Sequence, residues 1–103
     1  MKRNEDYRAD VIAELRRDPQ FAADYLSAAK ADSNEAFLIA LRDVAEARKG
    51  MKRLAREAKV NRENLYRALS RNGNPRMETL DSVLEALGIE IRFVAKRASR
   101  QKR

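Results

Sequence analysis

The chain has 103 residues, of which 44% are hydrophobic and 38% are charged, so it can form one small domain with a modest core. Its 23 Lys and Arg residues outnumber its 16 Asp and Glu residues, which gives a net charge of +7, and it contains no Cys, His or Trp. These absences exclude Cys or His metal sites, thiol chemistry and His-based catalysis, so we expect no cofactor, no metal and no enzymatic activity. The longest apolar run, residues 36–41, is too short to span a membrane, and no signal sequence is evident, so we expect a cytoplasmic protein.

The excess positive charge lies in the second half of the chain. Residues 1–50 hold 9 basic and 10 acidic side chains, whereas residues 51–103 hold 14 basic and 6 acidic ones. Residues 51–72 alone carry 7 basic and 2 acidic side chains. This asymmetry favours a polyanionic partner for the second half, although a solvated surface with a basic tail explains the counts about as well.

The first half predicts three helices, at about residues 6–17, 19–31 and 34–49, from apolar side chains that recur at steps of three and four. Pro19 suits the first turn of the second helix, because the first N–H groups of a helix have no partner within it. Gly50 is expected to end the third helix in a left-handed conformation.

The second half predicts three shorter helices, at about residues 51–58, 62–71 and 77–87, and then a short strand. In residues 89–94 (IEIRFV) apolar and polar side chains alternate, which is typical of a strand. A lone strand leaves its backbone unpaired, and no second strand is evident in the chain. The strand therefore indicates a dimer or the sheet of a partner; the alternative is an extended segment docked on the helices.

Residues 51–71 have the pattern of a helix-turn-helix, in which two short helices are joined by a tight turn. The small Ala55 lets the second helix cross close to the first, and Val60 fills the space at the turn. Lys59 stands where such a turn normally has Gly, at a cost of roughly 1 kcal/mol for a left-handed residue that is not glycine. The alternative is an ordinary helical hairpin with a solvated basic face, which the local charge and the capping residue Asn61 disfavour.

The outward side chains of the second helix are of the types that read base edges and phosphates. Glu63 has two open roles, because it can accept a hydrogen bond from cytosine or orient Arg67 four residues later. We expect two copies to bind a palindromic double-stranded operator as a homodimer. The expected base contacts are Arg62, Glu63, Tyr66 and Arg67. The expected contacts to the DNA backbone are Lys52, Arg53, Asn61, Ser70, Asn72, Asn74 and Arg76.

The phrases ALRDVAEARKGM, NLYRALS and GNPRMETL are more distinctive than a bare helix-turn-helix. Together with FAADYLSAA, they resemble the probable addiction-module antidote family, relatives of the HigA antitoxins, over about residues 20–94. The motif itself resembles the lambda-repressor-like (Xre-type) helix-turn-helix. The resemblance implies an all-α fold: a five-to-six-helix lambda-repressor-like DNA-binding domain with an N-terminal helical extension and a short C-terminal strand. Within one domain (1–103), we expect an extension (1–18), a helical part (19–94) and a disordered basic tail (95–103).

The same resemblance implies an antitoxin of a type II module, which binds a small RelE/HigB-like toxin and represses its own operon. Such a toxin is usually basic, so the acidic side chains of the first half are candidates for binding it, unless they only keep the helices soluble. The alternative is a stand-alone Xre-type transcriptional repressor with no toxin partner. An adaptor that has lost DNA binding is a further alternative, against which the basic face argues. The acidic candidates are Asp6, Asp10, Glu14, Asp18, Asp24, Asp32 and Glu35.

Overall fold

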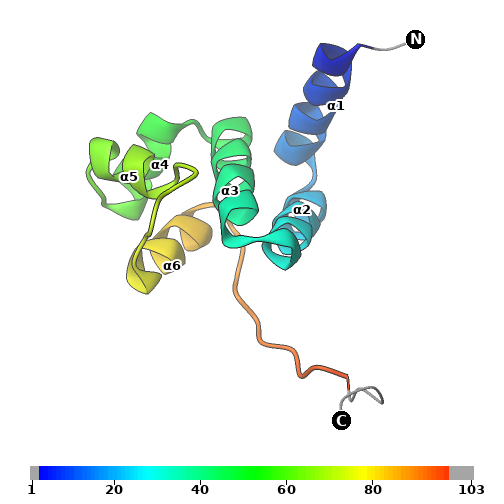
Figure 1. Cartoon of the computed structure of the whole chain (residues 1–103). Helices are drawn as coiled ribbons and strands as arrows, with labels where there is room; N and C mark the ends of the chain where they lie inside the picture. The colour runs from blue at the N-terminus through cyan, green and yellow to red at the C-terminus, as the bar shows by residue number, and fades with distance from the viewer. Residues whose placement is uncertain (1–2, 98–103) are drawn as a thin grey trace.

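The computed structural model describes residues 3–97, and over this range the chain forms six α-helices and no strand (Figure 1). The all-α expectation is confirmed, and the helices begin and end close to the predicted residues. The largest difference is at the fifth helix, which is shorter than predicted. The helices are α1 (Asn4–Arg17), α2 (Pro19–Asp32), α3 (Asn34–Arg48), α4 (Met51–Ala58), α5 (Arg62–Ala68) and α6 (Met77–Ala86).

The helices pack as two groups that meet through α3 and α4. In the first group α1, α2 and α3 contact one another, and in the second group α4 contacts both α5 and α6 (Figure 1). Leu41 and Val44 of α3 and Leu54 of α4 have no exposed surface, so the core continues through the junction between the groups. No helix among residues 3–97 is long and apolar enough to cross a membrane.

Side-chain caps account for the sharp boundaries between α1, α2 and α3. The carboxylate of Asp18 accepts hydrogen bonds from the first backbone N–H groups of α2, and Pro19 follows as its first residue. The hydroxyl of Ser33, rather than the carboxylate of Asp32, caps α3 by accepting from the backbone N–H of Ala36 at 2.9 Å. Gly50 follows α3 with a positive φ of 87°, but its ψ of 150° lies outside the left-handed helical region that the sequence predicts.

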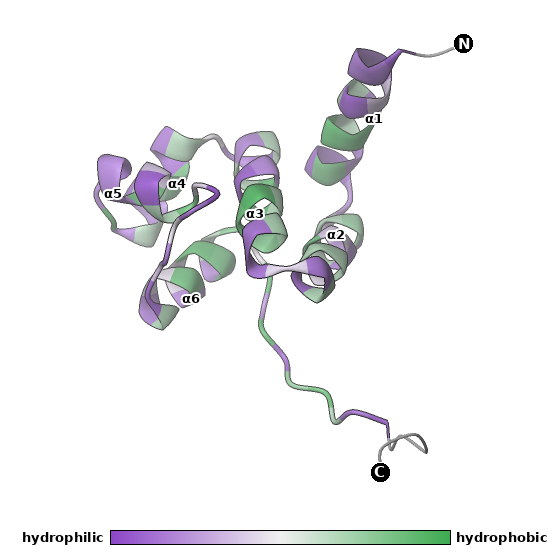
Figure 2. Cartoon of the chain, viewed as in Figure 1, coloured by the Kyte–Doolittle hydropathy of each residue, from purple (hydrophilic) through white to green (hydrophobic). Residues whose placement is uncertain are grey.

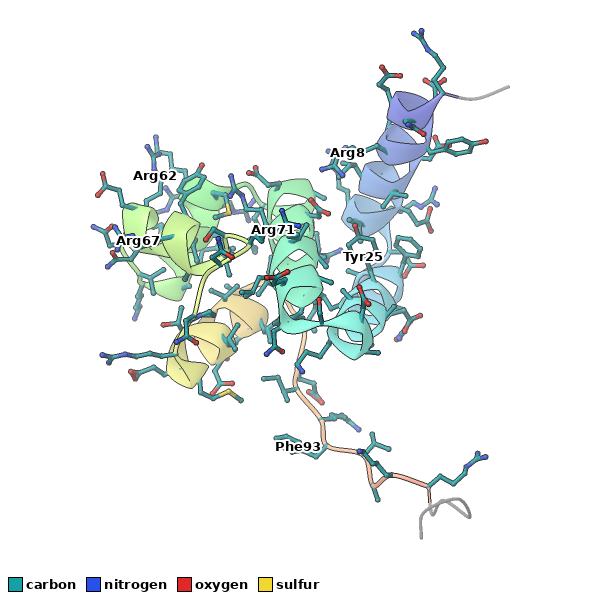
Figure 3. All side chains as sticks on the ribbon, in the orientation of Figure 1. Arg8, Tyr25, Arg62, Arg67, Arg71 and Phe93 are labelled. Atoms are coloured by element: carbon teal, nitrogen blue, oxygen red, sulfur yellow. The ribbon has the colours of Figure 1, made fainter. Side chains whose placement is uncertain are left out.

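Hydrogen bonds tie α1 and α2 to α3, which places the predicted N-terminal extension against the body of the protein. The Arg48 guanidinium donates to the backbone carbonyl of Leu15 at 3.0 Å. The Tyr25 hydroxyl donates to one carboxylate oxygen of Asp43 at 2.9 Å, and Arg8 donates to the other at 3.2 Å (Figure 3). Burial raises the pKa of Tyr25, and the hydrogen bond to Asp43 raises it further.

The described chain shows no strand at residues 89–94, where the sequence predicts one. The backbone N–H of Ile89 donates to Leu84 at 2.9 Å, but residues 90–97 make no backbone hydrogen bond with any described residue. The start of the segment is docked, because Ile89 packs against the core, but the rest runs away from the helices (Figures 1 and 2). The alternation in the sequence is real, but a strand needs a partner strand, and residues 3–97 supply none. Of the predicted basic tail, residues 98–103 lie outside the described residues.

Candidate nucleic-acid interface

The helices α4 and α5 are packed together and joined by the tight turn that the sequence predicts. Lys59 has a φ of 60° and a ψ of 45°, so it adopts the left-handed conformation usually taken by Gly. The backbone N–H of Val60 donates to the carbonyl of Ala55 at 3.0 Å, which closes the turn. Ala55 and Leu65 are buried, at 4% and 1% exposure, and fix α5 on α4. The two helices thus pack against each other across a tight turn.

Four outward side chains of α5, the expected base contacts Arg62, Glu63, Tyr66 and Arg67, are exposed to solvent. The helix begins at its N-cap Asn61, whose side-chain oxygen accepts from the backbone N–H of Asn64 at 3.1 Å. Figure 3 shows Arg62 and Arg67 projecting from α5 away from the rest of the protein. The outward face of α5 is therefore accessible without any rearrangement of the core.

Asn64 orients Arg67, and Glu63 does not. The guanidinium of Arg67 donates to the side-chain oxygen of Asn64 at 3.2 Å. The Arg62 and Glu63 side chains have no hydrogen-bond or ionic partner among the described residues. Of the two roles left open for Glu63, contact with a base is the one that its free carboxylate still permits.

Tyr66 has a neighbour that sequence reasoning missed. The guanidinium carbon of Arg42, from α3, lies 4.7 Å from the centre of the Tyr66 ring. Arg42 also donates to Glu46 at 3.1 Å, so the guanidinium is fixed on α3 from one side while it covers the ring. No local pattern links residues 24 positions apart, so only the tertiary structure, which brings these two long side chains together, reveals this contact.

The expected contacts to the DNA backbone divide into two sets. One set lines a single groove between α5, the loop that follows it and the start of α6, and Arg67 borders the same groove. Gly73 holds the loop against α5, because a Cβ there would lie 2.1 Å from the carbonyl oxygen of Ala68. This loop therefore has a fixed position beside α5. The members of the set are Asn61, Ser70, Asn72, Asn74 and Arg76.

The other set, Lys52 and Arg53, lies on α4 outside this groove. Arg53 donates to Glu57 at 2.9 Å, and the Lys49 ammonium lies 2.9 Å from the other oxygen of the same carboxylate. These hydrogen bonds, from Lys49 first and then from Arg53, lower the pKa of Glu57. Lys52 is exposed and has no ionic partner among residues 3–97. Of these two cations, Lys52 is therefore the freer to meet a phosphate.

Several acidic side chains of the first half already have local partners. Asp6 accepts from the backbone N–H of Arg3, Asp18 caps α2, and Asp24 accepts from Gln20. Glu14 pairs with Arg17, one turn away on α1. These contacts support the simpler explanation that the carboxylates stabilise their own helices. No described group of His, Cys, Asp and Glu side chains could hold a metal ion.

Comparison with known proteins identifies the family. The family model described as probable addiction module antidote protein matches residues 7–95, which is most of the chain. The chain belongs to this family. The match includes most of α1, whereas the resemblance seen in the sequence covers only about residues 20–94.

One curated relative of this antidote chain is a protein of Haemophilus influenzae described as uncharacterized. The two are 46% identical over 59 residues, a match that covers 57% of this chain and 60% of the relative. The match thus spans less than two thirds of the relative's length. No solved structure matches the chain.

Proposed function

We propose that the chain is a sequence-specific DNA-binding antitoxin of a type II module, which binds a small basic toxin of the RelE/HigB kind and represses its own operon. The proposal combines membership in the antidote family with an Xre-type reading of α4 and α5. The observation that carries the DNA-binding part is the exposed face of α5, where Arg62 is free and Arg67 is oriented by Asn64. The alternative remains a stand-alone repressor with the same interface and no toxin.

In this proposal α5 enters the major groove and α4 lies across the DNA backbone. Arg62 or Arg67 makes a bidentate contact to guanine O6 and N7, worth about 1–3 kcal/mol of discrimination against other bases. Glu63, which has no partner in the described chain, accepts a hydrogen bond from cytosine N4. Tyr66 also faces the major groove of the DNA, while the guanidinium of Arg42 lies over its ring.

The groove beside α5 supplies the phosphate contacts. Its amide, hydroxyl and guanidinium groups come from the end of α5, the loop and the start of α6, so they can follow one strand of the DNA backbone. Lys52 adds a contact from α4. Because these are charge and hydrogen-bond contacts to phosphates, they set the register and make binding sensitive to salt.

The toxin is expected to bind the less basic part of the chain. Residues 1–50 are near neutral, whereas residues 51–72 are strongly basic and would repel a basic toxin. This division leaves α5 uncovered when the toxin is bound. The antitoxin could therefore hold toxin and operator at the same time as a homodimer.

A tagged full-length chain, purified from its native host under mild conditions, tests the proposal. Bound DNA is sequenced and bound protein is identified by mass spectrometry. The proposal predicts the chain's own promoter together with a small basic protein at near-equal stoichiometry. Promoter DNA without a protein partner supports the stand-alone repressor, and a protein partner without DNA contradicts the assignment of α5.

A further inference from the structure

The segment after α6 exposes apolar side chains and unpaired backbone groups, and no other part of the described chain covers them. Phe93 is 90% exposed, Val94 86% and Ile91 38%, and residues 90–97 make no backbone hydrogen bond within residues 3–97. Figure 2 shows the segment alternating between hydrophobic and hydrophilic residues as it leaves the helices. We refer to residues 89–97 as the arm. An exposed row of unpaired N–H and C=O groups is a template for pairing with another strand.

The two faces of the arm differ in chemistry. The Arg92 guanidinium donates to the Glu90 carboxylate at 2.7 Å, so these two side chains lie on the same side of the backbone. Residues two apart share a face in extended chain, which places Ile89, Ile91 and Phe93 together on the other side. Ile89 is partly buried against the core, and this fixes the start of the arm on the helical body.

We propose that the arms of two copies pair as an antiparallel β-ribbon centred on Ile91. This inference deepens the proposed homodimer, whose interface nothing above assigns, and it rests on that part of the proposed function. In an antiparallel pair centred on Ile91, each residue faces the one equally far from Ile91 on the second copy. The two-fold axis then passes between the two Ile91 residues, as an isologous contact requires.

This register is self-complementary on both faces. Glu90 lies opposite Arg92 of the second copy, and the same pair occurs again across the axis. Ile91 lies opposite its own copy, and Ile89 lies opposite Phe93 of the second copy. Opposite charges and apolar pairs are the cross-strand neighbours that stabilise a sheet, whereas a shift by one residue would place apolar residues opposite charged ones.

A groove at the base of the arm offers a place for the incoming Phe93. Leu84 of α6 lines this groove together with Ile89 and Ile91, and the charged side chains of Asp81, Glu85, Glu90 and Arg92 line the rest of it. Because Phe93 of the second copy faces Ile89 in the proposed register, its ring would lie over these apolar side chains instead of in water. The edge of a toxin's sheet would satisfy the backbone of the arm equally well, but the matched charges at Glu90 and Arg92 favour a second copy of this chain.

The arm does not compete with the DNA interface. Figure 3 shows Phe93 below the helical body, away from Arg62 and Arg67, which project from its left side. Pairing through the arms therefore leaves α5 of both copies uncovered. It adds the second strand that residues 3–97 lack.

Single cysteines test the register, because the natural chain has no Cys. In Ile91→Cys the two cysteines face each other, with Cα atoms about 4.5–5.5 Å apart, within disulfide range. In Val94→Cys the two cysteines lie six positions apart along the ribbon, about 20 Å, and cannot bond. We expect the full-length Ile91→Cys chain to form a disulfide dimer under mild oxidation at least about tenfold faster than the Val94→Cys chain, since only its thiols are held together. Equal rates for the two variants, or no dimer of either, overturn the proposal.

Charge exchange between two chains tests the trans contact separately. Glu90→Arg and Arg92→Glu each place like charges opposite one another in their own dimers, so each variant should sediment mostly as a monomer. When the two variants are mixed, every cross-strand pair is again opposite in sign, although the pair within each arm stays like-charged. We expect the mixture to regain the wild-type dimer in analytical ultracentrifugation. Failure of the mixture to dimerise, or wild-type dimerisation of either variant alone, overturns the proposal.

The same variants separate this inference from the proposed function. Circular dichroism checks that each variant retains the helical fold. We expect it to do so, because Glu90 and Arg92 are exposed and contribute nothing to the core. If arm pairing fails but Arg62→Ala/Arg67→Ala loses promoter binding, only this interface is rejected. The DNA-binding antitoxin then stands. Confirmed arm pairing in a chain that binds no promoter DNA would reject the function and keep the dimer.

Discussion

The guanidinium carbon of Arg42 lies 4.7 Å from the centre of the Tyr66 ring, and this contact joins α3 to the outward face of α5. Arg42 belongs to the half of the chain that is near neutral, whereas Tyr66 belongs to the basic second half. The contact therefore links the part proposed to meet a toxin to the part proposed to read DNA. A cation over an aromatic ring at a partly exposed site contributes about 0.5–1 kcal/mol.

Replacing both partners of this contact should show coupling between them. Arg42→Ala and Tyr66→Ala each lose the cation–π contact, so the double variant should lose less stability than the sum of the two single losses. We expect a coupling energy of about 0.5–1 kcal/mol in the free energy of unfolding, measured with urea. The cycle removes the separate effect of losing the Arg42–Glu46 hydrogen bond. Strictly additive losses would mean that the contact does not stabilise the chain in solution.

Gly73 should not tolerate a side chain. A Cβ at this position would lie 2.1 Å from the carbonyl oxygen of Ala68, so the loop after α5 would have to move. We expect Gly73→Ala to lower the free energy of unfolding by about 1–3 kcal/mol, as overpacking does. Asn74→Ala, an exposed change in the same loop, serves as the control and should cost less than about 0.5 kcal/mol. Equal effects of the two changes would contradict the close approach of the loop to α5.

Glycine at position 59 should give a larger free energy of unfolding than another residue with a Cβ. The Lys59 φ of 60° is costly for a residue with a Cβ, by roughly 1 kcal/mol, and glycine removes this cost. We expect Lys59→Gly to be more stable than Lys59→Ala by up to about 1 kcal/mol in urea denaturation. The alanine variant loses the same charge but keeps the Cβ, so the comparison isolates the backbone effect. A glycine variant no more stable than the alanine variant would contradict the left-handed turn.

The ion cluster around Glu57 should make stability fall at acidic pH. Hydrogen bonds from Lys49 and Arg53 lower the pKa of Glu57 below its usual 4.5. A carboxyl whose pKa is lower in the folded state stabilises the fold above its unfolded pKa, and this contribution disappears as the pH falls through the lowered value. We expect Glu57→Gln to be less stable than wild type near neutral pH, and the difference to vanish once the pH has fallen below the lowered pKa of Glu57. The measurement is urea denaturation of both chains across this range. A difference that persists unchanged in acid would contradict the cluster.

The helices were predictable because their signals are local. Apolar spacing, the Asp18-Pro19 boundary and Gly50 define α1 to α3 without knowledge of tertiary contacts. The left-handed Lys59 was also predictable, because the motif requires that conformation whichever residue stands there. The exposed face of α5 followed once Leu65 was assigned to the core.

The strand predicted at residues 89–94 is not seen in the described chain, and the reason is that strands depend on non-local pairing. The alternation in residues 89–94 is a local signal, but a strand is formed by pairing, and the described chain holds no second strand. The Arg42–Tyr66 contact and the Arg67–Asn64 hydrogen bond were also missed. The first depends on how the fold brings the side chain of Arg42 on α3 within reach of Tyr66 on α5, and the second is one of several partners that the sequence offers Arg67.

The proposal that α5 reads DNA is tested by the affinity of Arg62→Ala/Arg67→Ala for the promoter DNA that is recovered with the wild-type chain. Fluorescence anisotropy compares this variant with Arg17→Ala/Lys30→Ala, which loses the same charge from α1 and α2. We predict a loss of at least about tenfold for the α5 variant and little change for the control, because a bidentate arginine–guanine contact is worth about 1–3 kcal/mol. Affinity of the α5 variant within about twofold of wild type would show that another surface binds the DNA.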